Sequence, residues 1–196
     1  RDGHCNILKS NTNLMQGILE LWKITGDDIY LKAMNVWINS IENYTDCGDR
    51  YSNISFFTNE HSFFNKPMFT TIHVLGFYCD YYVFTNNHNV IKYIDNKLHN
   101  IVYNQTEIGL FRVEPADITN DKYKMGWLDQ QTDTTVILLK GYQITGNKVY
   151  LDSAIKCVDA VIKYLKMPYG YIEYFDAGNG QNKYHSRLYL KFITLF

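Results

Sequence analysis

Residues 141–151 read Gly-Tyr-Gln-Ile-Thr-Gly-Asn-Lys-Val-Tyr-Leu, and residues 21–31 read Leu-Trp-Lys-Ile-Thr-Gly-Asp-Asp-Ile-Tyr-Leu. The two stretches start 120 residues apart. A third stretch halfway between them, residues 81–91, has an aromatic residue, an apolar residue, a threonine and a turn pair in the same places. The sequence therefore repeats with a period of 60 residues, and this repeat decides the fold.

The residues after each of these stretches have the spacing of one helical face. Apolar side chains at i, i+1, i+4, i+7, i+8 and i+11 predict an amphipathic helix. In the middle repeat Lys97 is the only polar residue among these places. The places are Tyr30, Leu31, Met34, Trp37, Ile38 and Ile41; Val90, Ile91, Ile94, Lys97, Leu98 and Ile101; and Tyr150, Leu151, Ala154, Cys157, Val158 and Val161. We also expect an apolar-rich helix before each turn, over residues 14–24, 69–84 and 132–144.

The turn between the two helices is predicted from three residues, Gly26, Asn86 and Gly146. Each stands where a helix ends and the chain needs a left-handed backbone conformation, which Gly or Asn adopts at least cost. Each repeat is therefore an antiparallel helical hairpin. The predicted hairpin units are residues 10–66, 67–126 and 127–185, with a fourth unit beginning as a helix at 186–196.

The predicted fold class is all-α, with hairpins of period 60 that form part of an (α/α) toroid. One hairpin alone cannot bury its apolar face, so such hairpins stack as an open solenoid or close into a ring. Long aromatic loops favour the ring, with the loops around a central pocket. Short strands are expected within these loops, at 109–113 and 170–175.

Composition bounds the classes of function. The 196 residues are 46% apolar and 20% charged with a net charge of −1, which is typical of one soluble globular domain over residues 1–196. Basic and acidic residues are balanced, so the sequence does not predict a nucleic-acid partner. No apolar run is long enough to predict a membrane span. The four cysteines, Cys5, Cys47, Cys79 and Cys157, have no metal-ligand spacing, so we expect buried thiols, no metal and no cofactor.

The motif at residues 142–154, Tyr-x-Ile-Thr-Gly-Asn-x-x-Tyr-Leu-x-x-Ala, follows Trp127-Leu128-Asp129. Together they resemble the (α/α)6 toroids known as six-hairpin glycosidases, and the Trp-x-Asp is similar to that of unsaturated glucuronyl and rhamnogalacturonyl hydrolases. The resemblance implies that Asp129 is a general acid/base acting on an oligosaccharide or polysaccharide that contains uronic acid. The turn is also similar to that of sugar epimerases and polysaccharide lyases. Six hairpins need about 360 residues, so the resemblance implies a missing remainder of a longer chain, a homodimer, or an open ring.

The first candidate site lies at the start of the third repeat. Asp129 and Asp133 stand at i, i+4 and share a helical face. Two close carboxylates in an aromatic pocket have separated pKa values, which supplies one acid and one base. Trp127 is a candidate platform for sugar stacking, and the other candidate substrate-binding residues here are Gln130, Gln131 and Arg112. The alternative interpretation is a helix cap at Asp129, a solvated Asp133 and a hydrophobic staple at Trp127.

The corresponding place in the preceding repeat departs from the hydrolase pattern. Those hydrolases have a second acidic residue there, and this chain has Phe69, Thr70 and Thr71.

The second candidate site lies near the end of the sequence. His185 is a candidate proton shuttle and Arg187 a candidate clamp for a uronate carboxylate, with Glu173 and Tyr184 as further substrate contacts. The pair Tyr184-His185 resembles a Tyr-His pair of uronyl C5-epimerases. The alternative is a surface histidine and a salt-bridged arginine.

Three functions therefore stay open. The first is glycoside hydrolysis through Asp129. The second is epimerisation or elimination through Tyr184, His185 and Arg187. The third is a non-catalytic toroid that binds glycans or a protein partner, including one appended to a glycosyltransferase.

Overall fold

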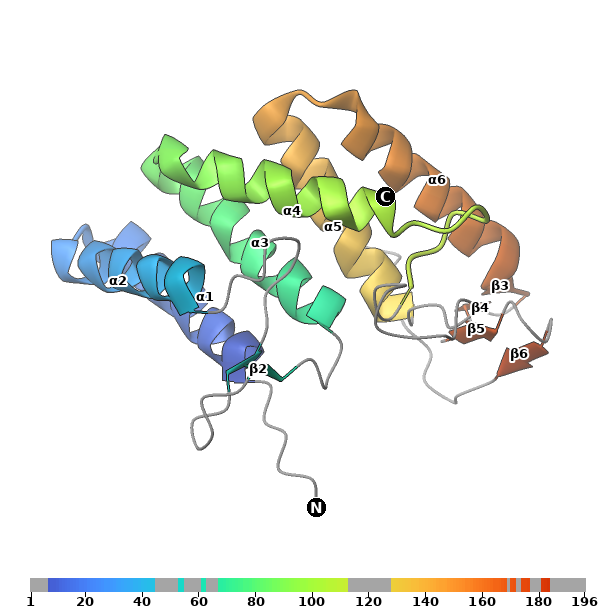
Figure 1. Ribbon diagram of the computed structural model, residues 1–196, viewed down its shortest axis with the longest axis horizontal. Helices are drawn as coiled ribbons and strands as arrows, with labels where there is room; N and C mark the ends of the chain where they lie inside the picture. The colour runs from blue at the N-terminus through green and yellow to red at the C-terminus, as the bar shows by residue number, and fades with distance from the viewer. Residues whose placement is uncertain are drawn as a thin grey trace, which may run out of the picture. The chain divides into compact units, whose positions relative to one another are not determined.

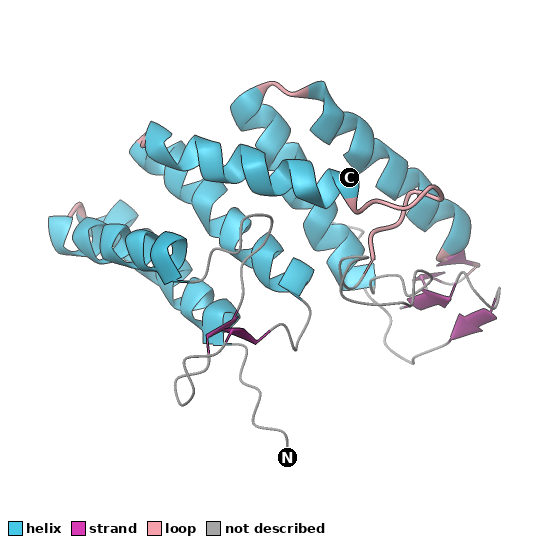
Figure 2. Ribbon diagram, viewed as in Figure 1, coloured by secondary structure: helices cyan, strands magenta, loops and turns pink. Residues whose placement is uncertain are grey.

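A computed structural model describes residues 7–44, 53–54, 61–62, 67–112, 128–168, 170–171, 174–176 and 181–183 of the chain. The contacts divide the chain into two compact units, residues 1–97 and 98–196, and each is described here by itself. Helices account for most of the described residues (Figure 2), as an all-α fold requires. The prediction of a single domain stays a prediction.

The first unit contains one complete helical hairpin and the start of a second (Figure 1). Its elements are α1 (Ile7–Thr25), α2 (Asp28–Tyr44), β1 (Asn53–Ile54), β2 (His61–Ser62), α3 (Pro67–Thr85), the 3-10 helix η1 (His88–Val90) and the first part of α4 (Ile91–Tyr103). Strands β1 and β2 pair antiparallel, with Asn53 opposite Ser62.

The second unit contains the end of α4 and a complete hairpin. Its elements are α5 (Leu128–Thr145), α6 (Lys148–Tyr164), β3 (Lys166–Met167), β4 (Gly170–Tyr171), β5 (Tyr174–Asp176) and β6 (Gln181–Lys183). Helices α5 and α6 lie side by side (Figure 1). Strand β3 pairs antiparallel with β4, and β5 pairs antiparallel with β6.

The three turns have the same hydrogen bonds, which confirms the 60-residue repeat. Gly26, Asn86 and Gly146 have φ angles of 68°, 53° and 71°, the predicted left-handed conformation. In each turn the preceding threonine donates its hydroxyl proton to the carbonyl four residues earlier, at 2.6–2.8 Å. The same hydroxyl accepts from the backbone N–H two residues later, which belongs to Asp27, Asn87 or Asn147. The side chain of that Asp or Asn accepts in turn from the backbone N–H two residues further along the chain.

Two helices begin earlier than predicted. Helix α1 begins at Ile7 and not at Leu14, and α5 begins at Leu128 and not at Thr132. The reason is that these first turns bury polar residues: Thr12, for example, is buried and donates to the Leu8 carbonyl at 2.7 Å. Apolar periodicity does not detect a turn whose buried side chains are hydroxyls that are satisfied within the helix.

The predicted strands differ from those in the structure. Within 109–113, the described part forms only an isolated bridge between Gln105 and Phe111. Within 170–175, the described residues belong to two strands, β4 and β5, which pair in separate two-stranded sheets. The helix predicted at 186–196 lies outside the described residues.

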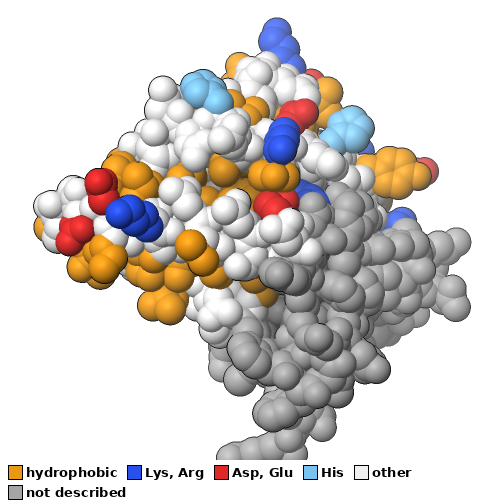
Figure 3. Space-filling model, turned by 60° about the vertical axis from the view of Figure 1, so that its left-hand side comes forward, with side chains coloured by type: hydrophobic (Ala, Val, Ile, Leu, Met, Phe, Trp, Pro, Cys, Tyr) orange, Lys and Arg blue, Asp and Glu red, His pale blue; other side chains and the backbone are white. Residues whose placement is uncertain are grey.

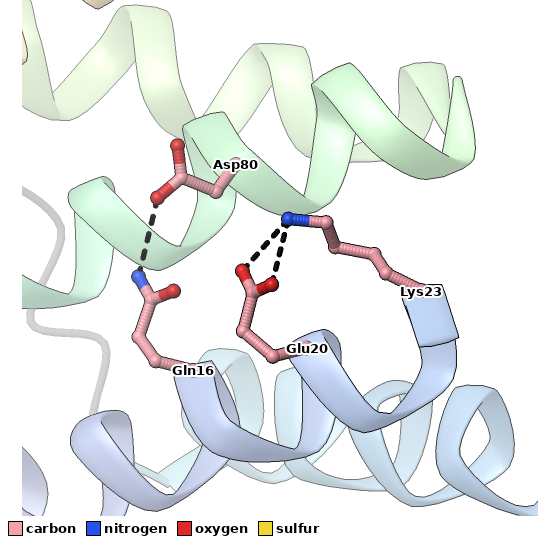
Figure 4. A network of polar contacts seen from close by, with 4 residues as sticks. All are labelled: Gln16, Glu20, Lys23 and Asp80. Carbon is pink, nitrogen blue, oxygen red and sulfur yellow. Dashed lines mark hydrogen bonds and ion pairs between the residues drawn. The ribbon is translucent and has the colours of Figure 1, made fainter. Parts of the chain in front are cut away.

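In the first unit, α3 packs on both helices of the preceding hairpin. Towards α1, the Gln16 amide donates to Asp80 of α3 at 3.4 Å, next to an ion pair of 2.8 Å between Lys23 and Glu20 (Figure 4). Towards α2, the hydroxyl of Tyr78 donates to Glu42 at 2.5 Å. These contacts fix α3 beside the hairpin.

Two more contacts with α2 extend this packing. The Tyr81 hydroxyl donates to Asn35 at 2.6 Å, and the Phe77 ring lies 5.1 Å from that of Trp37 in an edge-on arrangement. Helix α3 thus places its aromatic face on α2, the second helix of the preceding hairpin. Among the described helices, none is long and apolar enough to cross a membrane.

Candidate functional site

The start of α5 is polar and buried at the same time. Five consecutive or nearly consecutive polar side chains are almost fully buried: Gln130, Gln131, Thr132, Thr134 and Thr135. The three threonines each donate to the carbonyl four residues earlier, at 2.7–2.8 Å. Burying a hydroxyl without a partner costs free energy, and these bonds avoid that cost inside the helix itself.

Gln131 holds the loop that precedes the site. Its amide donates to the Phe111 carbonyl at 2.8 Å and accepts from the Phe111 amide at 2.7 Å. These two bonds make the pairing that a neighbouring strand would otherwise make. Direct contact of the Gln131 amide with a sugar would require these two bonds to break.

The same loop is anchored on α6. Gln105 donates to the Ser153 carbonyl at 2.9 Å and accepts from the Ser153 hydroxyl at 2.8 Å. Lys156 donates to the Thr106 carbonyl at 3.3 Å. Gly109 has a φ of 99°, and a Cβ on it would lie 2.6 Å from the Lys156 carbonyl oxygen, so glycine is required where the loop meets α6. The loop over residues 105–112 is therefore fixed at both ends of its path.

Arg112 ends this loop close to the start of α5. Its carbonyl accepts from the side-chain amide of Gln130 at 3.2 Å. Its side chain is half-buried, and in the described part of the chain the buried Nε atom has no hydrogen-bond partner. A guanidinium N–H group without a partner can form a charge-assisted bond with a carboxylate.

Asp129 and Asp133 are the half-buried side chains among the buried residues of this helix start. The Asp129 carboxylate accepts from the backbone N–H of Gln130 at 2.7 Å. Asp129 lies in the first turn of the helix, where the helix dipole favours negative charge. Asp133 follows one turn later, about 6 Å along the helix axis. The i, i+4 spacing places both carboxylates on one face, as predicted.

Cys157 of α6 lies behind Gln131. Its Sγ atom is 3.5 Å from the side-chain oxygen of Gln131. Burial raises the pKa of the Cys157 thiol to about 12, against a smaller opposite effect from a hydrogen bond with Thr135. This thiol is therefore neutral at physiological pH and contributes packing to the site.

A groove of the second unit lies elsewhere. It has a volume of about 500 Å³ and runs along α6, where charged residues of both signs line it, among them Glu107, Asp152, Lys156 and Asp159. None of the predicted site residues lines it. Within the ranges that the structure describes, no group of histidine, cysteine or acidic residues could hold a metal ion.

The remaining predicted site residues divide into two groups. Trp127, Glu173, Tyr184, His185 and Arg187 lie outside the described residues or in positions whose placement is not described. In α3, Thr70 and Thr71 are fully buried at the places that correspond to Gln130 and Gln131. Of the predicted site residues, the structure therefore describes Arg112, whose carbonyl accepts from the Gln130 side chain, and four residues at the start of α5: Asp129, Gln130, Gln131 and Asp133.

Sequence reasoning missed Gln105 and Ser153, which hold the loop. They stand 48 residues apart, and no motif or spacing marks such a pair. The one available signal was the run of polar residues at the start of a predicted core helix.

The sequence matches no protein family model and no curated protein. Solved structures with a similar fold include a sugar epimerase from a ruminal bacterium, with a TM-score of 0.64 and 15% identity. They also include a polysaccharide lyase, with a TM-score of 0.66 and 12% identity. A third is a family 76 glycoside hydrolase from a bovine Bacteroides thetaiotaomicron strain, with a TM-score of 0.56 and 15% identity.

The similarity extends over most of this chain but only part of the other proteins. It covers 88%, 92% and 85% of this chain, and 46%, 54% and 36% of the three solved chains in the same order. This chain thus spans about half the length of the first two structures. Because these neighbours are helical toroids, the likeness confirms the predicted fold class.

Proposed function

We propose that this chain belongs to a carbohydrate-processing enzyme, and that its reactive site lies at the start of α5. The observation that carries the proposal is the pair Asp129 and Asp133, half-buried on one face of a helix start whose other polar side chains are buried. A fixed pair of carboxylates at the edge of a buried polar region has the composition of an acid/base site.

In this proposal Asp129 acts as the general acid/base and Asp133 as its partner carboxylate. In glycoside hydrolysis, the protonated carboxyl donates its proton to the oxygen of the bond that breaks, and the ionised one activates water. Arg112 binds the carboxylate of a uronic acid through its guanidinium, and Trp127 stacks on the sugar ring. Gln131 acts as a positioning residue, because it holds the loop that ends at Arg112.

The neighbours support a sugar as the substrate class. These proteins are a sugar epimerase, a polysaccharide lyase and a glycoside hydrolase, which share a carbohydrate substrate and differ in reaction. The fold does not choose among these reactions. Hydrolysis is the reaction that the pair of carboxylates favours.

The test is product analysis with a panel of uronic-acid-containing oligosaccharides. Hydrolysis gives two shorter sugars and consumes one water, elimination gives an unsaturated product without water, and epimerisation leaves the mass unchanged. Mass spectrometry and NMR together separate the three outcomes. We expect hydrolysis, with turnover lowered at least about 100-fold in Asp129→Asn, because proton transfer by a positioned group contributes about this much or more.

The control variant is Asp28→Asn, which removes an exposed carboxylate at the start of α2. It should leave turnover unchanged. Full activity in a folded Asp129→Asn variant would remove Asp129 from the mechanism. Glycan binding without any turnover, lost in Asp129→Asn, would replace the proposed enzyme with a binding module at the same site.

A further inference from the structure

Helix α6 has a row of four exposed charged side chains, Asp152, Lys156, Asp159 and Lys163. Their spacing of i, i+4, i+7 and i+11 places them on one face of the helix. On the face of the molecule that Figure 3 shows, charged side chains are few and scattered among hydrophobic and uncharged ones. The row on α6 differs from that surface because its charges follow one another and alternate in sign.

The repeat indicates that this face of α6 stays open. Helix α3 packs on α2 through two tyrosine hydroxyls, and α5 contacts α4 where Gly141 meets the Leu98 side chain. The places of the charged row are nevertheless exposed in both earlier hairpins. They are Lys32, Val36, Asn39 and Asn43 of α2, and Lys92, Asn96, His99 and Tyr103 of α4. A helix of a following repeat that packs on α6 in the same way therefore leaves the row uncovered.

The charged row lines the groove of about 500 Å³ along α6. The other side of the groove is the loop after α4, which lies beside α6 (Figure 1) and contributes Glu107 and Ile108. Ile155, Ala160 and the ring of Tyr164 also line it. Pockets that bind small molecules have volumes of about 300–1,000 Å³ and combine apolar groups with a few polar ones. The groove has both properties.

The two lysines of the row do not neutralise the carboxylates beside them. The i, i+4 spacing allows ion pairs of Asp152 with Lys156 and of Asp159 with Lys163. Instead, Lys156 donates to a carbonyl of the loop at 3.3 Å, and the Lys163 ammonium lies 4.9 Å from the centre of the Tyr164 ring. Within the part of the chain that the structure describes, neither aspartate has a hydrogen bond or an ion pair. Their oxygens are therefore available as acceptors for a ligand.

We propose that this groove binds a neutral stretch of a sugar chain, as a second carbohydrate site besides the one at Asp129. Alternating charges repel an anion and a cation alike, whereas sugar hydroxyls both donate and accept hydrogen bonds. The apolar face of a sugar ring packs on an aromatic ring such as that of Tyr164. The row extends over about 16 Å of the helix axis, the length of a short oligosaccharide. This inference rests on the carbohydrate substrate of the proposed function.

The two sites differ in the sugars that they select. The site at α5 includes Arg112, which favours the carboxylate of a uronic acid. The groove has three acidic and two basic side chains, so its net charge of −1 disfavours a uronic acid. A chain with both kinds of sugar would therefore bind the groove through its neutral units.

The test is methyl NMR on the Asp129→Asn variant labelled at its isoleucine methyl groups. Ile108 and Ile155 line the groove, whereas the exposed Ile162 of α6 and the buried Ile137 of α5 do not. The probes are the linear hexasaccharides of glucose, mannose, xylose and galacturonic acid, and trilysine, each up to about 10 mM. At least one neutral hexasaccharide should give saturating shifts at Ile108 and Ile155, without shifts at Ile162. The hexagalacturonate should bind there more weakly.

Asp159→Ala tests the contact itself in this background. It should weaken the binding of the neutral sugar at least about tenfold, because a hydrogen bond to a charged acceptor is lost. The control is Lys148→Ala, which removes an exposed charge of the same helix outside the groove and should leave this affinity unchanged. Unchanged affinity in folded Asp159→Ala overturns the proposal.

The remaining outcomes separate the groove from the reaction proposed at Asp129. Turnover by the wild type without methyl shifts in the groove overturns the second site alone. Methyl shifts in the groove without turnover support the second site and remove the proposed reaction. Shifts with trilysine but with none of the neutral sugars would assign the groove to a cationic ligand, which also overturns the proposal.

Discussion

Gly17 and Gly146 both lie in open surroundings, but Gly17 has a helical backbone conformation and Gly146 a left-handed one. A Cβ added to either would meet no atom within 4 Å. Gly17 lies inside α1, whereas Gly146 has a φ of 71° in the turn after α5. The pair therefore separates the effect of backbone conformation from the effect of packing.

We expect opposite changes in stability from one substitution. Gly17→Ala should raise the free energy of unfolding by up to about 1 kcal/mol, because alanine loses less conformational entropy in a helix. Gly146→Ala should lower it by about 1–2 kcal/mol, because a Cβ is unfavourable in the left-handed conformation. Urea unfolding at one dilute protein concentration measures both, and changes of equal sign would contradict the argument.

The Cys157 thiol predicts how stability depends on pH in the alkaline range. Its pKa is raised from 9.0 to about 12 in the folded chain. Above pH 9 the unfolded chain loses this proton while the folded chain keeps it, so the free energy of unfolding falls as pH rises from 9 to 12. The slope from this group approaches about 1.4 kcal/mol per pH unit.

Cys157→Ala isolates this effect. The variant is less stable at pH 7 because it loses buried volume, but its stability should fall less steeply between pH 9 and 12 than that of the wild type. The difference between the two slopes is the measured quantity. Parallel curves would mean that the thiol titrates alike in both states.

At the scale of elements, the loop over 105–112 depends on one amide side chain. Gln131→Leu should lower the free energy of unfolding by about 2–4 kcal/mol, because the buried amide and carbonyl of Phe111 both lose their partner. Hydrogen exchange at the Phe111 amide should become faster as well. Gln143→Leu, an exposed position of the same helix, serves as the control. Unchanged exchange at Phe111 would show that another group holds the loop.

The elements also show why some boundaries could be predicted and others could not. The turns at Gly26, Asn86 and Gly146 were predictable because their hydrogen bonds lie within a few consecutive residues. The starts of α1 and α5 were not, because they depend on polar side chains that are buried. The loop was not predictable either, since Gln131 and Phe111 are 20 residues apart.

The period of 60 residues made most of the architecture predictable, because each repeat gives an independent observation of the same hairpin. The candidate site was predictable only where it lies on a helix, as with Asp129 and Asp133. Trp127, Glu173, Tyr184, His185 and Arg187 lie outside the described residues, so their roles stay predictions.

The repeated turn has a consequence for how proteins of this kind change in length. All of its hydrogen bonds are local, so a gene duplication or deletion with its ends in the connecting loops adds or removes a hairpin without disturbing any turn. What such an event changes is the pair of helix faces left at the ends of the array. Gain and loss of hairpins are therefore limited by whether the helix faces left at the ends of the array find a partner of matching chemistry.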